Sequence, residues 1–169
     1  GEADGVIVKE IDLNDNIWWS VEDNLLKVKN GPDEIGSTLW TKNSFENFRV
    51  SLEFKFIEGN IDSGIFMRGS DHLNPQIQIG VSGSLKRDMT CSPYIPKKGY
   101  PKEATKVKSL LKMNDWNNMV AEAIGNRYSV WLNGEQVMDY TMEDANLMGP
   151  VGIQLHSKRQ MEIWYRSID

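Results

Sequence analysis

Residues 48–56 run Phe48-Arg49-Val50-Ser51-Leu52-Glu53-Phe54-Lys55-Phe56, so that apolar and polar side chains alternate without a break. In an extended strand, successive side chains point to opposite faces, which puts every apolar residue of this stretch on one side and every polar one on the other. A helix would distribute the same apolar side chains around its whole circumference. The stretch therefore predicts a β-strand with one buried face and one exposed face.

The same alternation recurs along most of the chain, with turn residues between the segments. Asn133-Gly134 is typical of a tight hairpin, and Gly149-Pro150 introduces a further alternating segment. The pattern predicts strands over residues 25–29, 37–41, 63–68, 76–81, 120–124, 127–132, 136–140, 151–156 and 161–166. Ten or more short strands indicate an all-β fold, an antiparallel β-sandwich of the jelly-roll type. Helix is scarce, and we expect at most one turn over residues 143–147.

No linker, repeat or low-complexity tract divides the sequence, so we expect a single domain over residues 1–169. One segment, from Lys86 to Ala104, has three prolines and four lysines and no alternation. A loop of this length in a compact domain is usually functional or disordered.

Composition excludes several classes of protein. Hydrophobic residues make up 40% and charged residues 25%, as in an ordinary globular domain. No apolar run approaches the roughly 18 residues of a membrane-spanning helix. A net charge of −5 disfavours binding to nucleic acid, whose phosphates attract a basic surface. Cys91 is the only cysteine, so neither an internal disulfide nor a cysteine-based zinc site is possible. The oligomeric state is open.

The first residues, Gly1-Glu2-Ala3-Asp4, contain neither an initiator methionine nor the basic and apolar segments of an export signal. We read the chain as a mature bacterial protein whose signal has been removed. The expected location is the periplasm, the cell surface or the medium.

Polar side chains that share a strand face are the first candidates for a site. If the strands that carry them are neighbours in one sheet, these side chains form a single polar surface. Amides, a guanidinium, a carboxylate and an imidazole together provide the donors and acceptors that sugar hydroxyls need. The alternative is the ordinary water-exposed face of an antiparallel sheet. The residues are Glu53, Arg68, Gln76, Gln78, Gln154 and His156.

Aromatic residues could stack on sugar rings at such a surface. Phe66 shares a face with Arg68, and Trp131 and Trp164 point away from the aliphatic residues of their strands. Either tryptophan could instead pack beneath a crossing loop. Tyr94, in the loop that lacks alternation, is a further candidate for substrate binding.

Two other segments are less promising. Glu10-Ile11-Asp12-Leu13-Asn14-Asp15 resembles the acidic catalytic strand of laminarinase-like β-glucanases, but its third acid is an aspartate and no aromatic-rich strand leads into it. We interpret it as a solvated acidic edge. His72 lies in a polar loop and is expected to be solvated, and Lys97 and Lys98 to be exposed.

In its ordered motifs the sequence resembles the 3-keto-disaccharide hydrolase domain family, long known as domain of unknown function 1080, which has a concanavalin A-like fold. The similarity extends in order over nearly the whole chain. The motifs are Trp19, Val21, Asp23 and Leu26; Leu39-Trp40-Thr41 and Asn47-Phe48; Leu52-Glu53-Phe54-Lys55; Asn60 with Ser63-Gly64-Ile65-Phe66-Met67-Arg68; Asp115-Trp116-Asn117; Gly125-Asn126-Arg127; Leu132-Asn133-Gly134; and Gly149-Pro150-Val151-Gly152-Ile153-Gln154-Leu155-His156.

The chain also departs from the family pattern. Gln76 stands where the family usually has a glutamate, Gly80-Val81 stand where an aspartate is common, and Asn-Ser-Gly is lengthened to Asn60-Ile61-Asp62-Ser63-Gly64. The loss of one carboxylate bears on the activity rather than on the fold.

The resemblance implies a hydrolase or lyase that cleaves glycosidic bonds of 3-keto-glycosides. A ketone at C3 acidifies the hydrogen at C2, so a base removes it and the C1 substituent leaves by elimination; water then adds. The base would be His156 or Glu53, and Arg68 would stabilise the enolate. Gln76, Gln78 and Gln154 would bind hydroxyls. A divalent cation is an alternative to Arg68, although no ligand set for one is evident and no other cofactor is expected.

Two further hypotheses remain. The first is a non-catalytic carbohydrate-binding module on the same fold, which the glutamine at position 76 favours. The second is a structural domain of a larger assembly. Retention of Arg68 and His156 favours the enzyme.

Overall fold

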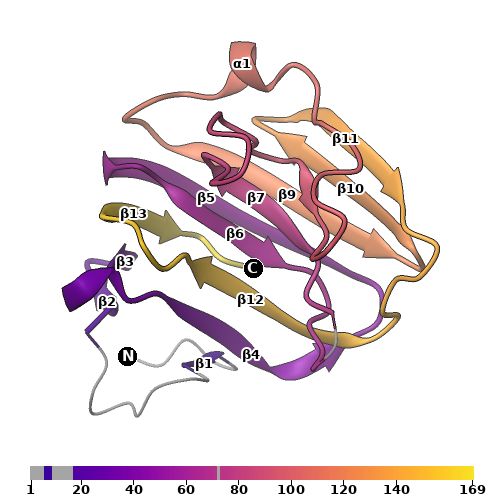
Figure 1. Cartoon of the computed structure of the whole chain (residues 1–169), viewed down its shortest axis with the longest axis horizontal. Coiled ribbons are helices and arrows are strands. Elements are labelled where there is room, and N and C mark those ends of the chain that lie inside the picture. Colours follow the sequence, from indigo (N-terminus) through magenta and orange to yellow (C-terminus); the bar gives the residue numbers. More distant parts are fainter. Residues whose placement is uncertain (1–5, 9–16, 72) are drawn as a thin grey trace.

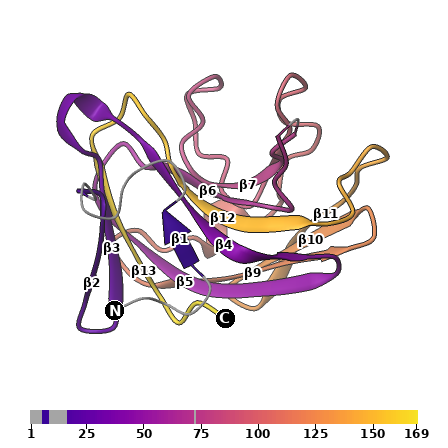
Figure 2. The same cartoon turned by 90° about the horizontal axis from the view of Figure 1, so that it is seen from below.

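The computed structural model describes residues 6–8, 17–71 and 73–169. Two antiparallel sheets pack face to face (Figures 1 and 2). Sheet A contains, in spatial order, β1 (Val6–Val8), β4 (Ser37–Phe45), β12 (Gly149–Leu155), β6 (Asp62–Phe66), β7 (Gln76–Gly80) and β8 (Pro93–Tyr94). Sheet B contains β11 (Glu135–Thr141), β10 (Arg127–Leu132), β9 (Asn117–Ile124), β5 (Phe48–Gly59), β13 (Met161–Arg166), β3 (Leu25–Lys29) and β2 (Trp19–Glu22). The predicted antiparallel β-sandwich is confirmed.

The long strand β5 behaves as its alternation predicts. Leu52, Phe54 and Phe56 are 1%, 0% and 6% exposed and point into the space between the sheets. From the other sheet Ile65 and Ile77, both fully buried, belong to the same core. Removing each such side chain from water stabilises the fold by roughly 1.5–3 kcal/mol. The apolar stripe of β5 therefore joins the two sheets.

The predicted strands and the observed ones agree closely in the second half of the chain and at β5, and differ in detail elsewhere. Three strands, β1, β2 and β8, were not predicted, because they are only two to four residues long and show little alternation. β8 lies in the long segment between Lys86 and Ala104, which is therefore partly ordered as sheet. The helical turn expected over residues 143–147 is wrong; the helices of the described chain are η2 (Pro32–Glu34) and α1 (Val107–Leu110).

Several connecting segments rise from the outer side of sheet A (Figure 2). They include the long segment that follows β7, residues 30–36, and residues 156–160 after β12. The outer face of sheet A is thus surrounded by loops. No helix in the described residues is long and apolar enough to cross a membrane.

Candidate functional site

The outer face of sheet A brings together polar and aromatic side chains from four strands. In an antiparallel pair, residues directly opposite each other point to the same face. Gln154 of β12 pairs with Gly64 of β6, which pairs with Gln78 of β7. One row further, Phe66 pairs with Gln76. The predicted grouping of the three glutamines and Phe66 on one face is present. Tyr94, opposite Gln76, extends the row.

Asp62 is the polar centre of this face. Its carboxylate is only 5% exposed and accepts a hydrogen bond from Gln78 Nε2 at 2.9 Å. On the other side, Arg159 Nη2 lies 3.2 Å from Asp62 Oδ2, and His156 Nδ1 lies 3.9 Å from the same oxygen. A buried carboxylate requires such partners, because an unpaired charge out of water is costly. A guanidinium, an imidazole and an amide therefore lie around the carboxylate of Asp62.

The ring of His156 has a defined hydrogen-bond partner. Its Nδ1 lies 2.6 Å from the carbonyl oxygen of Ser157. A carbonyl oxygen only accepts, so Nδ1 carries the hydrogen and Nε2 keeps its lone pair in the neutral ring. The side chain is 38% exposed. The lone pair of Nε2 is thus available to a ligand, and Asp62 lies beside the ring.

Three buried polar atoms of this region lack a partner among the described residues: Gln76 Oε1, Gln154 Oε1 and Arg159 Nε. A buried polar atom without a hydrogen bond costs about 1–3 kcal/mol, and most folded proteins avoid it. Two of the three are acceptors and one is a donor. A ligand that carries both hydroxyl hydrogens and acceptor oxygens, as a sugar does, matches this set.

Aromatic side chains form one side of the site. Trp40 stacks on Phe66, with ring centroids 5.1 Å apart and planes 15° from parallel. The indole lies against Gly69 and Gly152, where an added Cβ would come within 2.4 and 2.8 Å of ring atoms. The two glycines therefore let the indole lie flat on the sheet.

Tyr94 and Tyr100 form a second aromatic pair, with centroids 5.1 Å apart. Burial raises the pKa of Tyr100, a hydrogen bond with Ser82 opposes the rise, and the negative charge of Asp62 adds to it. The hydroxyl of Tyr100 therefore stays protonated at neutral pH. These rings come from the segment that follows β7 and cover the β7 side of the face.

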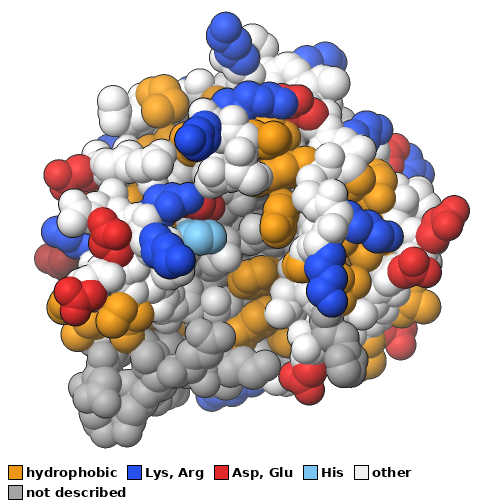
Figure 3. All heavy atoms as spheres, in the orientation of Figure 1, with side chains coloured by type: hydrophobic (Ala, Val, Ile, Leu, Met, Phe, Trp, Pro, Cys, Tyr) orange, Lys and Arg blue, Asp and Glu red, His pale blue; other side chains and the backbone are white. Residues whose placement is uncertain are grey.

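The molecular surface is hollowed on this face (Figure 3). A histidine side chain, in pale blue, is visible there, with basic and acidic side chains beside it. Hydrophobic side chains line the opposite side of the recess. Such an arrangement of apolar surface with a few converging polar groups is typical of a small-ligand site.

Arg68 does not belong to this site. Its side chain is 0% exposed and donates to the carbonyl oxygens of Glu46, Gly125, Asn146 and Ala123 and to Asn47 Oδ1. Alternation had placed it beside Phe66, but β6 ends at Phe66 and Arg68 has a positive φ of 60°. The chain turns there, and the guanidinium runs inward to the ends of β5 and β9. The expectation that Arg68 shares a surface with His156 is therefore wrong.

Glu53, Trp131 and Trp164 lie on the other side of the sandwich. Glu53 accepts hydrogen bonds from Arg166 at 3.0 and 3.3 Å on the outer face of sheet B. Lys27 lies 4.5 Å from the ring centroid of Trp164, and Arg49 lies 5.8 Å from that of Trp131. Each ring therefore faces a cation of the protein itself. The expected single surface is divided because β5, β10 and β13 belong to sheet B.

Sequence reasoning missed two residues of the site, Asp62 and Arg159. Asp62 has the same alternation as Gly64 and Phe66, which was the available signal, but it lies in the lengthened stretch before Ser63. Arg159 lies in the turn between β12 and β13, and no periodicity marks it. Only the chain's path brings it to Asp62.

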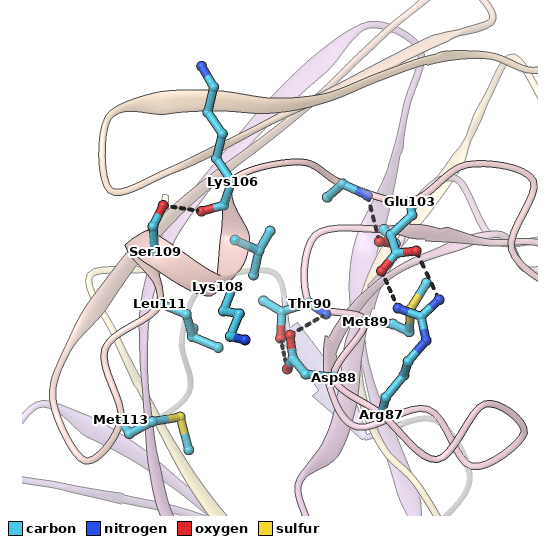
Figure 4. Close-up of a pocket in the computed structure, with 13 residues that line it drawn as sticks. Arg87, Asp88, Met89, Thr90, Glu103, Lys106, Lys108, Ser109, Leu111 and Met113 are labelled. Carbon is cyan, nitrogen blue, oxygen red and sulfur yellow. Dashed lines mark hydrogen bonds and ion pairs between the residues drawn. The ribbon is translucent and has the colours of Figure 1, made fainter.

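A separate cavity of about 640 Å³ lies between α1 and the segment that contains Arg87 and Asp88 (Figure 4). Arg87 pairs with Glu103, and Thr90 donates to Asp88 at 2.7 Å. Burial raises the pKa of Asp88. None of the residues predicted for the site line this cavity.

Among the described residues, no group of three or more His, Cys, Asp or Glu side chains is arranged to hold a metal ion. The acidic stretch from Glu10 to Asp15, and His72, lie outside the described residues.

Comparison with known families matches residues 7–169 to the model of the 3-keto-alpha-glucoside-1,2-lyase-like domain. The chain belongs to this family. Membership of the 3-keto-alpha-glucoside-1,2-lyase-like family supports a carbohydrate-related function for the chain. No curated protein matches it.

Solved structures of low identity share the fold of this lyase-like domain. A protein from Parabacteroides distasonis, described as a candidate glycosyl hydrolase, is 21% identical with a TM-score of 0.66, covering 89% of this chain and 88% of that one. The carbohydrate-binding module CBM66 from Bacillus subtilis is 12% identical with a TM-score of 0.69, covering 98% and 94%. A Bacillus subtilis protein with a galectin-like fold is 13% identical with a TM-score of 0.63, covering 89% and 84%. The predicted concanavalin A-like fold is confirmed.

Proposed function

We propose that the outer face of sheet A binds a 3-keto-glycoside and cleaves its glycosidic bond by elimination across C1 and C2. The observation that carries the proposal is the cluster at Asp62, where the imidazole of His156 and the guanidinium of Arg159 lie beside one buried carboxylate. Family membership supports the substrate class. The Parabacteroides distasonis neighbour, with its hydrolase description, is consistent with it.

Each residue of the cluster has a role in this chemistry. His156 Nε2 takes the proton from C2, the C1–O bond breaks, and a C1=C2 double bond forms. Arg159 stabilises the negative charge that develops on the C3 oxygen. Asp62 orients Arg159, and the carbonyl oxygen of Ser157 orients the ring of His156. The departing oxygen takes up a proton, for which the protonated hydroxyl of Tyr100 is a candidate donor. Water then adds to the double bond, so that the net reaction is hydrolysis.

The test compares 3-keto-trehalose with trehalose as substrates. We expect turnover of the keto form alone, because only the ketone acidifies the hydrogen at C2. His156→Ala and Arg159→Met should each lower kcat by at least about 100-fold. Trp131→Phe, a change on the outer face of sheet B, serves as the control and should keep wild-type kcat. Equal turnover of both sugars, or full activity of both site variants, contradicts the proposal.

A carbohydrate-binding module without catalysis is the second candidate. The specific observation that favours it is Gln76, a neutral amide on the site where the family usually has a carboxylate. The similarity in fold to CBM66 is compatible with it. Binding of 3-keto-trehalose by calorimetry, without turnover in the wild type, supports the module and excludes the enzyme.

The extracytoplasmic location remains a prediction from the sequence. Fractionation of the native bacterium with an antibody against the domain checks it; recovery in the cytoplasm contradicts it.

A further inference from the structure

Three side chains on the outer face of sheet A form a hydrogen-bonded series. Gln78 Nε2 donates to Asp62 Oδ1 at 2.9 Å, and Gln76 Nε2 lies 3.4 Å from Gln78 Oε1. Asp62, Gln78 and Gln76 are 3%, 1% and 6% exposed. The series therefore connects the charged centre of the site to its aromatic side.

The carboxylate fixes the direction of both amides. A carboxylate has no hydrogen to donate, so Gln78 turns its NH₂ group toward Asp62 and its oxygen away. The second hydrogen bond of Gln78 Nε2, to the carbonyl oxygen of Val81 at 3.2 Å, requires the same orientation. Gln76 must then offer its NH₂ group to Gln78 Oε1. Its own oxygen is left at the end of the series as an acceptor.

That oxygen lies over Gly64 of β6, which has no side chain to displace it. A Cβ added to Gly64 would come within 2.8 Å of Gln76 Oε1. The oxygen is buried and has no partner among the described residues. Gln154 Oε1 is also unpartnered, but no hydrogen bond to a described residue fixes the side-chain amide of Gln154, so this amide can turn to accept or to donate. Gln76 is thus the amide of fixed polarity.

We propose that Gln76 is a specificity-determining residue whose Oε1, oriented by Asp62 through Gln78, accepts a hydrogen bond from a hydroxyl of the bound sugar. The inference rests on the proposed function and states which groups of the sugar lie at Gln76 and at Arg159. A ligand group that can only accept, such as the ketone oxygen, is rejected at Gln76 and belongs near Arg159. Because Oε1 is buried in the free protein, sugar entry is accompanied by a shift of the side chains that cover it.

The test uses fluorine, which replaces a hydroxyl without being able to donate. Methyl 3-keto-α-glucoside and its 2-, 4- and 6-deoxyfluoro analogues are titrated against the His156→Ala protein by calorimetry. We expect one of the analogues to bind roughly 10–100-fold more weakly than the parent, the range for a buried acceptor left without its donor.

Variants at Gln76, Gln78 and Gln154 distinguish the orientation of the Gln76 amide from a purely structural role of these side chains. The Gln76→Met substitution should weaken binding of the parent sugar. The variant should then bind the parent and the discriminated fluoro analogue with equal affinity. Gln78→Met leaves Gln76 in place but frees its amide to turn, so the discrimination should fall below about threefold. Gln154→Met is the matched control and should keep the discrimination. A purely structural role for Gln78 would instead weaken all four sugars by the same factor.

The outcomes distinguish the two proposals. Binding of the parent with no loss for any fluoro analogue, or discrimination that persists in Gln78→Met, overturns the role of Gln76 and leaves the proposed function standing. Failure of all four sugars to bind contradicts the proposed function and removes this inference with it.

Discussion

At the scale of single residues, Arg68 is a buried positive charge whose partners are mainly backbone carbonyl oxygens. Burial lowers the pKa of its guanidinium, and Tyr128 and Glu46 oppose that change. Its hydrogen bonds reach the turn after β4 and the end of β9, so one side chain joins sheet A to sheet B. The planar group with five donors suits this task better than any other side chain.

Arg68→Met should lower the free energy of unfolding by about 3 kcal/mol or more, since several buried carbonyl groups lose their donor. Urea unfolding followed by tryptophan fluorescence measures the change. Arg49→Met is the matched control: the Arg49 side chain is 64% exposed and pairs with Glu122, so its loss should cost no more than about 1 kcal/mol. Equal effects of the two substitutions would show that Arg68 does not join the sheets.

Cys91 illustrates the effect of burial on a thiol. It is 0% exposed, and desolvation raises its pKa well above the ordinary value. The thiolate is the reactive form, so a thiol reagent such as DTNB at pH 8 should label the native protein at least about 100-fold more slowly than the urea-unfolded chain. Rapid labelling of the native protein would contradict the burial.

At the scale of elements, the packing of β12 against β4 depends on a glycine, Gly152. Gly152 pairs with Trp40, and an added Cβ would come within 2.8 to 3.1 Å of three indole atoms. The indole therefore lies over the backbone of β12 and stacks on Phe66 of β6. Three strands share this contact.

Gly152→Ala should displace the indole, at a cost of about 1–3 kcal/mol for overpacking. Near-ultraviolet circular dichroism should report the altered tryptophan environment, and thermal unfolding the lost stability. Adding Trp40→Leu to Gly152→Ala provides the control, because a smaller side chain removes the clash. If the double variant loses as much stability as the two single variants lose together, the clash between the added methyl group and the indole does not cause the loss in Gly152→Ala.

At the scale of the whole molecule, the two outer faces have different chemistry. The outer side of sheet A carries Asp62, His156 and two amide oxygens that have no partner among the described residues, whereas sheet B carries tryptophans that lie against cations. Arg166 lies 4.0 Å from the ring centroid of Trp116, in addition to its ion pair with Glu53. Sugar binding is therefore expected on one side of the sandwich only.

Trp131→Ala and Phe66→Ala test this division in the His156→Ala background with 3-keto-trehalose. Loss of Phe66 should weaken binding about 10-fold or more, while loss of Trp131 should leave affinity within about twofold and lower stability modestly. A Trp131 variant that loses affinity while its thermal transition is unchanged would place the sugar on sheet B.

The amino-acid sequence by itself determined most of the strands, the sandwich and the family, and missed the short strands β1, β2 and β8. Alternation states which side chains of one strand emerge together, so Gln76 with Gln78, and Gln154 with His156, could be grouped strand by strand. It does not state which sheet a strand joins, and that depends on pairings between distant segments such as β12 with β6.

Only the tertiary structure could therefore show that the six polar candidates do not share one face. Glu53 lies on β5 in sheet B, and Arg68 turns inward where β6 has ended, because the rule of alternation holds only while the strand continues. Arg159 reaches Asp62 from a turn for which no periodicity exists. The conformation of a strand depends on neighbouring residues and can be predicted from their order. The site depends on contacts between segments nearly 100 residues apart, which that order does not specify.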